Sequence, residues 1–220
     1  MNKVLFIAPH PDDETLGCGG TILKHAHQGD EIHWLVLTTT KNSTLFDKAY
    51  HLKREEELKH INKFYNFDSF VQLDFKTAEL DSYSKKDLID VVKKEIININ
   101  PCVIYLPFSE DPHSDHRISF EVLESICKKF RLKKLKSIRA YETLSETNHD
   151  LNRKSFKPNL WIDISEFLDE KIKAMEIYTS EYGEHPFPRS KKSIEALAIL
   201  RGSESDNLYA ESFLILKEYQ

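Results

Sequence analysis

Two short polar segments of the chain carry side chains of the kind that bind metal ions and activate water. The first segment reads Ala-Pro-His-Pro-Asp-Asp-Glu and supplies His10, Asp12 and Asp13. The second reads His-Ser-Asp-His and occupies residues 113–116. A catalytic zinc ion takes three protein ligands, drawn from histidine nitrogens and carboxylate oxygens, and keeps one position for water. Together the two segments contain the residue types for such a site.

An apolar run precedes each polar segment. Residues 4–7 and residues 103–106 have the length and β-branched content of buried strands in a parallel sheet. Open α/β sheets bind their ligands at the carboxyl ends of the strands. We therefore expect the two polar segments to meet at one edge of a sheet and to form one metal site from two loops.

The residues alone leave the roles within each segment open. Asp12 and Asp13 are adjacent, so one carboxylate could bind the metal while the other faces the bound water as a base. His113 and His116 lie three residues apart at the expected start of a helix, a spacing that places both on one face. One of them could bind the metal while the other stabilises an oxyanion. Asp115 could orient a histidine.

Each polar segment also has a purely structural explanation. Asp and Pro are common turn residues, and an Asp can cap a following helix, so either segment alone could be an ordinary turn. Their joint occurrence at two strand ends favours the metal site.

The glycines that follow the first segment do not form a nucleotide-binding loop. Gly17, Gly19 and Gly20 lack the GxGxxG spacing, and three acidic residues precede them where a phosphate would have to lie. Close packing of a helix against a sheet explains these glycines better.

The rest of the chain alternates between helix and strand patterns. Helices are predicted at residues 15–28, 45–66, 84–99, 118–130, 165–180 (with Ser165 as N-cap) and 190–201. Further strands are predicted at residues 31–38, 69–73, 137–141, 159–164 and 212–216. This alternation predicts a Rossmann-like α/β fold, with a mostly parallel sheet and helices on both faces. The length favours a single domain over residues 1–220.

Composition excludes several classes of function. The chain has 31 Lys and Arg against 36 Asp and Glu, a net charge of −5, which argues against a general nucleic-acid-binding surface. Its three cysteines form no CxxC pair, which favours a reducing compartment and hence the cytoplasm. No apolar run reaches the length of a signal-peptide core or a membrane span. A homo-oligomer is compatible with the sequence but is not specified by it.

The two polar segments resemble the signatures of a known family. Residues 8–20, APHPDDETLGCGG, resemble the opening signature of the PIG-L (LmbE-like) family of zinc-dependent N-acetylglucosaminyl deacetylases, and residues 113–116 resemble its second signature. Arg54 to Glu57 matches the Arg-x-x-Glu helix of that family. The stretches FKPNLWIDIS, PFPRS, RG and AESF at residues 156–213 resemble its bacterial members.

The resemblance implies one zinc ion per chain, held by His10, Asp13 and His116. Metal found after purification follows affinity rather than availability, so iron(II) could serve in the cell. The resemblance also implies a substrate contact by Arg54, although a long arginine on a helix can simply be solvated.

The resemblance further implies the catalytic roles. Asp12 would be the base that activates the water. His113 would stabilise the tetrahedral oxyanion or protonate the leaving amine, and Asp115 would orient a histidine. The implied reaction removes an N-acyl group, acetyl in the family, from an amino sugar or its conjugate.

Three other functions compete with this interpretation. One is a zinc amidase that acts on a non-sugar or thiol-conjugate amide. Another is a binding module that holds a metal or a sugar nucleotide without catalysis, against which stands the second aspartate of the adjacent pair. The third is a dinucleotide-dependent or methyl-donor enzyme, which the missing phosphate loop disfavours.

One departure from the family pattern concerns the sugar. Relatives that act on simple N-acetylglucosamine conjugates often carry an acidic residue after the third strand, where it accepts hydrogen bonds from sugar hydroxyls. Here Thr77 or Ala78 occupies that place, so the sugar is not specified, although Asp74 or Glu79 could substitute.

The segment HPFPRS, from His185 to Ser190, has two interpretations. It could form a lid or a pocket rim, because loops often carry function. It could equally be a surface loop stiffened by its prolines.

Overall fold

The chain folds around one mixed β-sheet. The computed structural model describes residues 1–41, 43–149, 151 and 155–220. Within these residues the sheet has seven strands in the order β3-β2-β1-β4-β5-β7-β6. The strands are β1 (Lys3–Ala8), β2 (Glu31–Thr39), β3 (Ser69–Lys76), β4 (Val103–Pro107), β5 (Ser137–Tyr141), β6 (Leu160–Asp163) and β7 (Ala210–Glu218). Strands β1 to β5 pair in parallel, whereas β7 is antiparallel to both β5 and β6.

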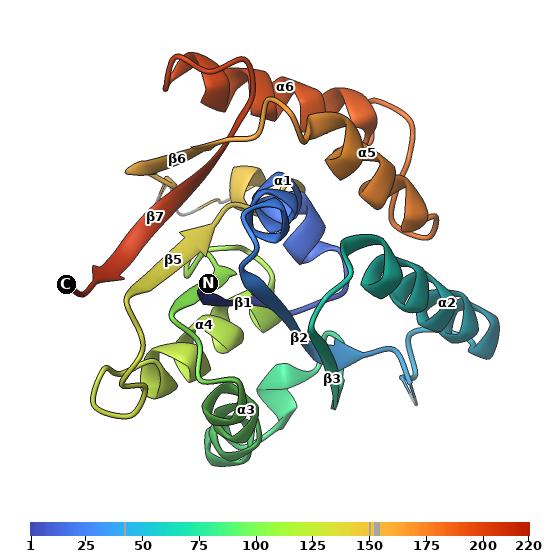
Figure 1. Cartoon of the computed structure of the whole chain (residues 1–220). Coiled ribbons are helices and arrows are strands. Elements are labelled where there is room, and N and C mark those ends of the chain that lie inside the picture. The colour runs from blue at the N-terminus through green and yellow to red at the C-terminus, as the bar shows by residue number, and fades with distance from the viewer. Residues whose placement is uncertain (42, 150, 152–154) are drawn as a thin grey trace.

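Helices cover both faces of the sheet (Figure 1). They are α1 (Asp13–His27), α2 (Lys48–Tyr65), α3 (Lys85–Ile99), α4 (Ser114–Ile126), α5 (Leu168–Ile177) and α6 (Lys191–Ser203), with short 3-10 turns at Leu80–Ser82 and Thr147–His149. Helices α1, α2, α5 and α6 pack on one face, and α3 and α4 pack on the other. The predicted Rossmann-like α/β fold is therefore confirmed. None of the helices in the described part of the chain has the length and apolarity needed to cross a bilayer.

Strand β1 shows why the apolar runs are continuous. Val4 and Phe6 enter the core beneath α1, whereas Leu5 and Ile7 enter the core beneath α3 and α4, and all four are fully buried. A strand that is covered on both faces needs apolar residues at every position, and not only at alternate ones.

The glycines of α1 serve close packing, as predicted. A Cβ atom at Gly17 would lie 2.3 Å from the ring of Tyr141, and one at Gly20 would lie 2.7 Å from Ile164. The hydroxyl of Tyr141 donates to the carbonyl of Ile7 at 2.9 Å, so its ring is held in place. This packing brings the first turn of α1 down onto the sheet, where Asp13 begins the helix.

Strands β1 and β4 lie side by side at the centre of the sheet. The helix that follows β1 packs on one face of the sheet, and the helix that follows β4 packs on the other. The chain therefore diverges beyond the carboxyl ends of these two strands, and this divergence opens the crevice where doubly wound sheets bind ligands. Both polar segments of the sequence begin at this crevice.

Several helix boundaries differ from the predicted ones, and three helix starts are informative. Helix α1 begins at Asp13 rather than at residue 15. Helix α4 begins at Ser114 rather than at residue 118, because the His113 side chain caps its first turn. Helix α5 begins at Leu168, and Ser165 is not its N-cap; the Ser165 hydroxyl instead donates to Asp163 at 2.5 Å. In the first two cases the polar segment itself forms the start of the helix.

Candidate metal centre and active site

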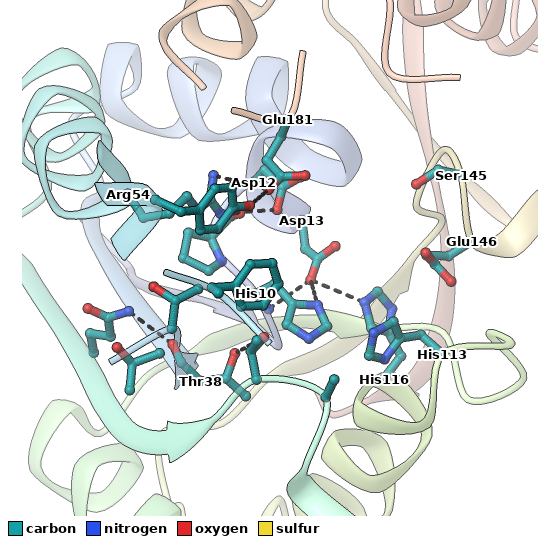
Figure 2. Close-up of a pocket in the computed structure, with 18 of the residues that line it drawn as sticks. His10, Asp12, Asp13, Thr38, Arg54, His113, His116, Ser145, Glu146 and Glu181 are labelled. Carbon is teal, nitrogen blue, oxygen red and sulfur yellow. Dashed lines mark hydrogen bonds and ion pairs between the residues drawn. The ribbon is translucent and has the colours of Figure 1, made fainter. Parts of the chain in front are cut away.

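Three predicted ligands come together around one carboxylate oxygen (Figure 2). Asp13 Oδ2 lies 3.4 Å from His10 Nδ1 and 3.2 Å from His116 Nε2. One ligand atom from each of these residues lies within 4.8 Å of the others. His10 and Asp13 come from the segment after β1, and His116 comes from the first turn of α4. The two polar segments therefore meet as expected.

Each histidine of this cluster turns its second ring nitrogen toward another carboxylate. His10 Nε2 lies 2.9 Å from Asp115 Oδ2, and His116 Nδ1 lies 2.8 Å from Asp111 Oδ2. Metal-binding histidines almost always bond in this way through the nitrogen that does not face the metal. The predicted role of Asp115, to orient a histidine, thus has a geometric counterpart in its contact with His10.

The two outer carboxylates are themselves held in place. Asp115 accepts hydrogen bonds from the backbone N–H groups of Ala78 at 2.7 Å and Leu80 at 3.1 Å. Asp111 accepts a hydrogen bond from the Thr147 hydroxyl at 2.6 Å. Both carboxylates are completely buried, so neither histidine ring is free to turn away from Asp13.

The charges of the cluster fit a bound cation. Burial lowers the pKa of His10, but hydrogen bonds to Asp115 and Asp13 outweigh this effect and raise it to about 9. Burial also lowers the pKa of His116, and Asp13 and Asp111 again outweigh it. His116 Nε2 is buried without a hydrogen-bond partner among the described residues. Three carboxylates thus surround two histidines, which is a donor set suited to a divalent metal.

Asp12 is held in an unusual conformation beside this cluster. Its backbone has φ 111° and ψ −29°, a region that costs a non-glycine residue about 1–3 kcal/mol and is often found at functional sites. Its N–H donates to the buried carboxylate of Glu14 at 3.1 Å. Oδ2 of Asp12 is buried without a hydrogen-bond partner among the described residues, although Arg189 Nη1 lies 3.5 Å away.

The surroundings of Asp12 make its carboxylate a stronger base. Burial raises its pKa well above the usual range, and the negative charges of Glu181 and Asp13 raise it further. Arg189 and Arg54 act in the opposite direction but do not compensate. A base is most effective when its pKa lies near the working pH, so this direction favours proton transfer.

His113 has the protonation state of a neutral hydrogen-bond donor. Its Nδ1 accepts the backbone N–H of Asp115 at 3.1 Å, which assigns the ring proton to Nε2. Burial lowers its pKa to about 4, with help from the neighbouring His10 and His116. His113 therefore stays neutral at pH 7.

Arg54 is buried, so the interpretation of a solvated side chain is wrong. Helix α2 directs it inward, where it is 4% exposed and donates to the carbonyl of Pro11. Its other amino group bonds Ser180 Oγ at 3.0 Å and Glu57 at 3.1 Å. Arg54 thereby ties the first polar segment to α2, and its guanidinium still lines the pocket.

The cluster of His10, Asp13 and His116 lies in a pocket of about 170 Å³, and most of the residues that line it have polar side chains. Sequence reasoning missed several of its residues. Glu181 accepts a hydrogen bond from Tyr50 and forms an ion pair with Arg189, and Glu146 lines the pocket beyond the histidines. No motif marks them, because they come from separate loops. Asp111 had a detectable signal, since it precedes the second polar segment in the sequence Asp-Pro-His.

The pocket rim includes two segments that the sequence analysis singled out, residues 77–78 after β3 and residues 185–190. Thr77 and Ala78 line the pocket where an acid was expected, and neither Asp74 nor Glu79 does. From the segment 185–190, Arg189 reaches the pocket, whereas Ser190 caps α6 and His185 is exposed. The segment thus contributes to the rim, and its role as a lid stays a prediction.

Comparison with known proteins decides the family. A profile of the family described as GlcNAc-PI de-N-acetylase, PIG-L, matches residues 5–127, which is more than half of the 220 residues and contains both polar segments. The chain belongs to the PIG-L family. This confirms the membership predicted from the two signatures. The match ends at residue 127, so the extent of the PIG-L domain over residues 1–220 stays a prediction.

Several relatives of this PIG-L protein are deacetylases. A diacetylchitobiose deacetylase of Thermococcus kodakarensis is 27% identical over 227 residues, covering 96% of this chain and 82% of the relative. The solved structure of N,N'-diacetylchitobiose deacetylase from Pyrococcus horikoshii, in complex with an inhibitor, is 23% identical with a TM-score of 0.78. It covers 98% of this chain and 84% of that one.

The shared fold alone does not determine the reaction. The 4-carboxy-2-hydroxymuconate hydratase GalB of Pseudomonas putida KT2440 has a TM-score of 0.80 at 18% identity, covering 100% of this chain and 98% of its own. Function in this PIG-L protein must therefore be argued from the site.

Asp111 offers a test of the metal centre. We expect Asp111→Asn to weaken metal binding about 10- to 100-fold, because the amide cannot hold His116 Nδ1 as a charged acceptor does. Competition with a chromophoric chelator measures this affinity. Asp81→Asn, the same change at an exposed position, is the matched control. Equal affinities in the two variants would contradict the role of Asp111.

Proposed function

We propose that this PIG-L protein is a metal-dependent hydrolase that removes an N-acetyl group from an amino sugar or an amino-sugar conjugate. The observation that carries the proposal is the arrangement around Asp13. Two histidines with carboxylate partners contact it, and the buried Oδ2 of Asp12 in the same pocket accepts no hydrogen bond from the described residues. Residues 1–220 would form one domain of the family. A cytoplasmic location, consistent with three free cysteines, is part of the proposal.

His10, Asp13 and His116 would hold one zinc ion, and iron(II) could replace it in the cell. A metal bound there would polarise the amide carbonyl and lower the pKa of water. The orientation of both histidines by Asp115 and Asp111 supports this ligand set. His10 is shared with a second possible group, His113 and Asp115, which competes with it as a ligand set.

Asp12 would take the proton of the attacking water as it adds to the amide carbon. The raised pKa of Asp12 supports this role, as does its Oδ2, which accepts no hydrogen bond from the described residues. His113, neutral and with its proton on Nε2, would donate to the oxyanion of the tetrahedral intermediate. Collapse of the intermediate would break the C–N bond, and the proton that Asp12 took from the water would pass to the leaving amine nitrogen. The products are acetate and a free amino sugar.

The lining of the pocket supports a sugar substrate. Most of its lining residues have polar side chains, which suits a polyhydroxylated ligand rather than an apolar one. Phe46 and Tyr50 also line the pocket, and their rings stack 4.6 Å apart, 14° from parallel. Such a flat aromatic face can pack against the C–H face of a pyranose ring. Arg54 would support the site from the same side.

The test is a substrate panel with identified products. Metal-loaded protein is incubated with N-acetyl-D-glucosamine, N,N'-diacetylchitobiose, N-acetylglucosaminyl malate and a non-sugar N-acetyl amide. Acetate and free amine are quantified before and after removal of the metal by a chelator. We expect equimolar acetate and amine from a sugar substrate and loss of both on chelation.

The alternatives predict different results. A zinc amidase would release acetate from the non-sugar amide in preference to every sugar. A hydratase or a binding module would release no acetate from any of them. Either result would contradict the proposed function.

A further inference from the structure

Apart from Asp12, the proposed base, four carboxylates in or behind the pocket are already engaged. Asp13 and Asp115 contact His10, and Asp111 behind them contacts His116. Glu181 accepts a hydrogen bond from the Tyr50 hydroxyl and forms an ion pair with Arg189 at 2.7 Å, and Arg54 Nη1 lies 3.8 Å away. These groups therefore have little acceptor capacity left for a substrate.

Glu146 differs from them. It lines the pocket, is partly buried, and makes no hydrogen bond or ion pair through its carboxylate within the described residues. In Figure 2 it lies with Ser145 beyond the histidines and Asp13, on the side opposite Arg54 and Glu181. A carboxylate that faces a pocket without a protein donor can accept hydrogen bonds from a ligand.

Ser145 beside it shows a second unused polar group. Its Oγ is buried and has no hydrogen-bond partner in the described parts of the chain. Its backbone has φ 79°, a conformation that is uncommon for a residue other than glycine. Buried polar atoms are nearly always satisfied, so an exception at a pocket wall indicates a missing partner.

The turn that presents both residues is firmly built. The Glu146 N–H donates to the Thr143 carbonyl at 3.1 Å, and the Thr143 N–H donates to Thr147 Oγ1 at 2.8 Å. Thr147 in turn donates to Asp111, the carboxylate that orients His116. The turn between β5 and the 3-10 turn Thr147–His149 is therefore fixed relative to the metal cluster.

The opposite wall has no acid at the end of β3. Thr77 Oγ1 accepts from Thr38 Oγ1 at 3.2 Å, and the Ala78 N–H is used by Asp115. The hydroxyls of a sugar therefore meet no carboxylate there.

We propose that Glu146, with Ser145, forms the hydroxyl-binding subsite that selects the sugar substrate of this enzyme. The Glu146 carboxylate accepts hydrogen bonds from hydroxyl groups of the sugar. Ser145 Oγ forms a hydrogen bond with a neighbouring oxygen of the sugar. The subsite favours a neutral polyol over an anionic conjugate, because an acid near Glu146 would be repelled. This inference rests on the proposed deacetylase function and specifies its substrate.

The experiment measures kcat and KM for N-acetyl-D-glucosamine and its 3-, 4- and 6-deoxy analogues. The proteins are wild type, Glu146→Ala, Glu146→Gln and the control Glu184→Gln, which changes an exposed glutamate outside the pocket lining. We expect Glu146→Ala to raise KM about 10- to 100-fold with kcat little changed, as for loss of a hydrogen bond to a charged group. Glu184→Gln should match wild type.

The deoxy analogues identify the contact. With wild-type enzyme, one deoxy analogue should show the same increase in KM that Glu146→Ala causes with N-acetyl-D-glucosamine. With Glu146→Ala, that analogue should show no further increase in KM, because the two changes remove the same interaction. If the increases in KM caused by Glu146→Ala and by the missing hydroxyl multiply for every analogue, the proposal is overturned. An unchanged KM in Glu146→Ala would also overturn it. If Glu146→Ala loses its metal, Glu146 helps to position Asp111 instead, and the proposal is also overturned. No acetate release by wild-type enzyme from any sugar would instead reject the proposed function.

Discussion

Replacing Asp12 by Asn should lower kcat about 100- to 10,000-fold, the usual contribution of a general base, while the protein keeps its metal. The amide has nearly the shape of the carboxylate but cannot accept the proton of the attacking water. Asp12→Ala should be inactive to a similar degree. The rate of acetate release and the metal content of the same samples measure both parts of this prediction.

The position of Asp12 explains why its substitution should lower turnover without removing the metal. Its Oδ2 faces Arg189 and makes no contact with His10 or His116, whereas Asp13 Oδ2 approaches both. Asp74→Asn, the same substitution at an exposed position of β3, is the matched control and should leave kcat unchanged. Near wild-type turnover in Asp12→Asn would refute the assignment of the base. If Asp12→Asn loses its metal, the assignment of Asp13, and not Asp12, as the metal ligand is refuted.

Replacing His116 by Ala should remove the metal and, with it, the activity. An outer partner of a metal ligand is worth about 10- to 100-fold in affinity, so loss of the ligand itself should exceed ~100-fold. Metal analysis after gel filtration and chelator competition measure the loss. His60→Ala, which changes an exposed histidine of α2, should retain metal and turnover.

The same measurement on His113→Ala separates the two possible ligand sets. His10 can group either with Asp13 and His116 or with His113 and Asp115. We expect His113→Ala to keep its metal and to lose turnover, because in the proposed mechanism His113 would donate to the oxyanion. A variant His113→Ala without metal, beside His116→Ala with metal, would show that the second set is correct.

The strands and loops that carry the site could be predicted from the sequence, because local residue patterns determine them. The runs at residues 4–7 and 103–106 are apolar at every position, a property of strands covered on both faces, and β1 and β4 confirm this. Polar segments directly after two neighbouring parallel strands must meet at one edge of the sheet. The contacts of Asp13 with His10 and His116 follow from that arrangement.

The roles of Asp12 and Asp13 depended on backbone geometry that no pattern shows. The residue at φ 111° turns its carboxylate away from the histidines, whereas Asp13, the first residue of α1, faces them. A sequence cannot indicate which of two adjacent aspartates takes the strained conformation. The family resemblance supplied that assignment, and the geometry supports it.

The outer parts of the site required tertiary structure. Glu181 follows α5 and Arg189 precedes α6, and their ion pair near Asp12 depends on how these helices pack beside α2. Glu146 lies in a turn whose path depends on the bond between Thr147 and Asp111. Such contacts join segments far apart in the chain, and none of the segments carries a recognisable motif.

The most direct test of the central claim is a zinc titration of chelator-stripped protein with acetate release as the readout. The substrate is the best sugar of the panel. If His10, Asp13 and His116 form one catalytic site, acetate release should rise linearly and reach its maximum at one equivalent of zinc per chain. Acetate release that is independent of added metal, or zinc bound at one equivalent with no acetate formed from any sugar, would contradict the account.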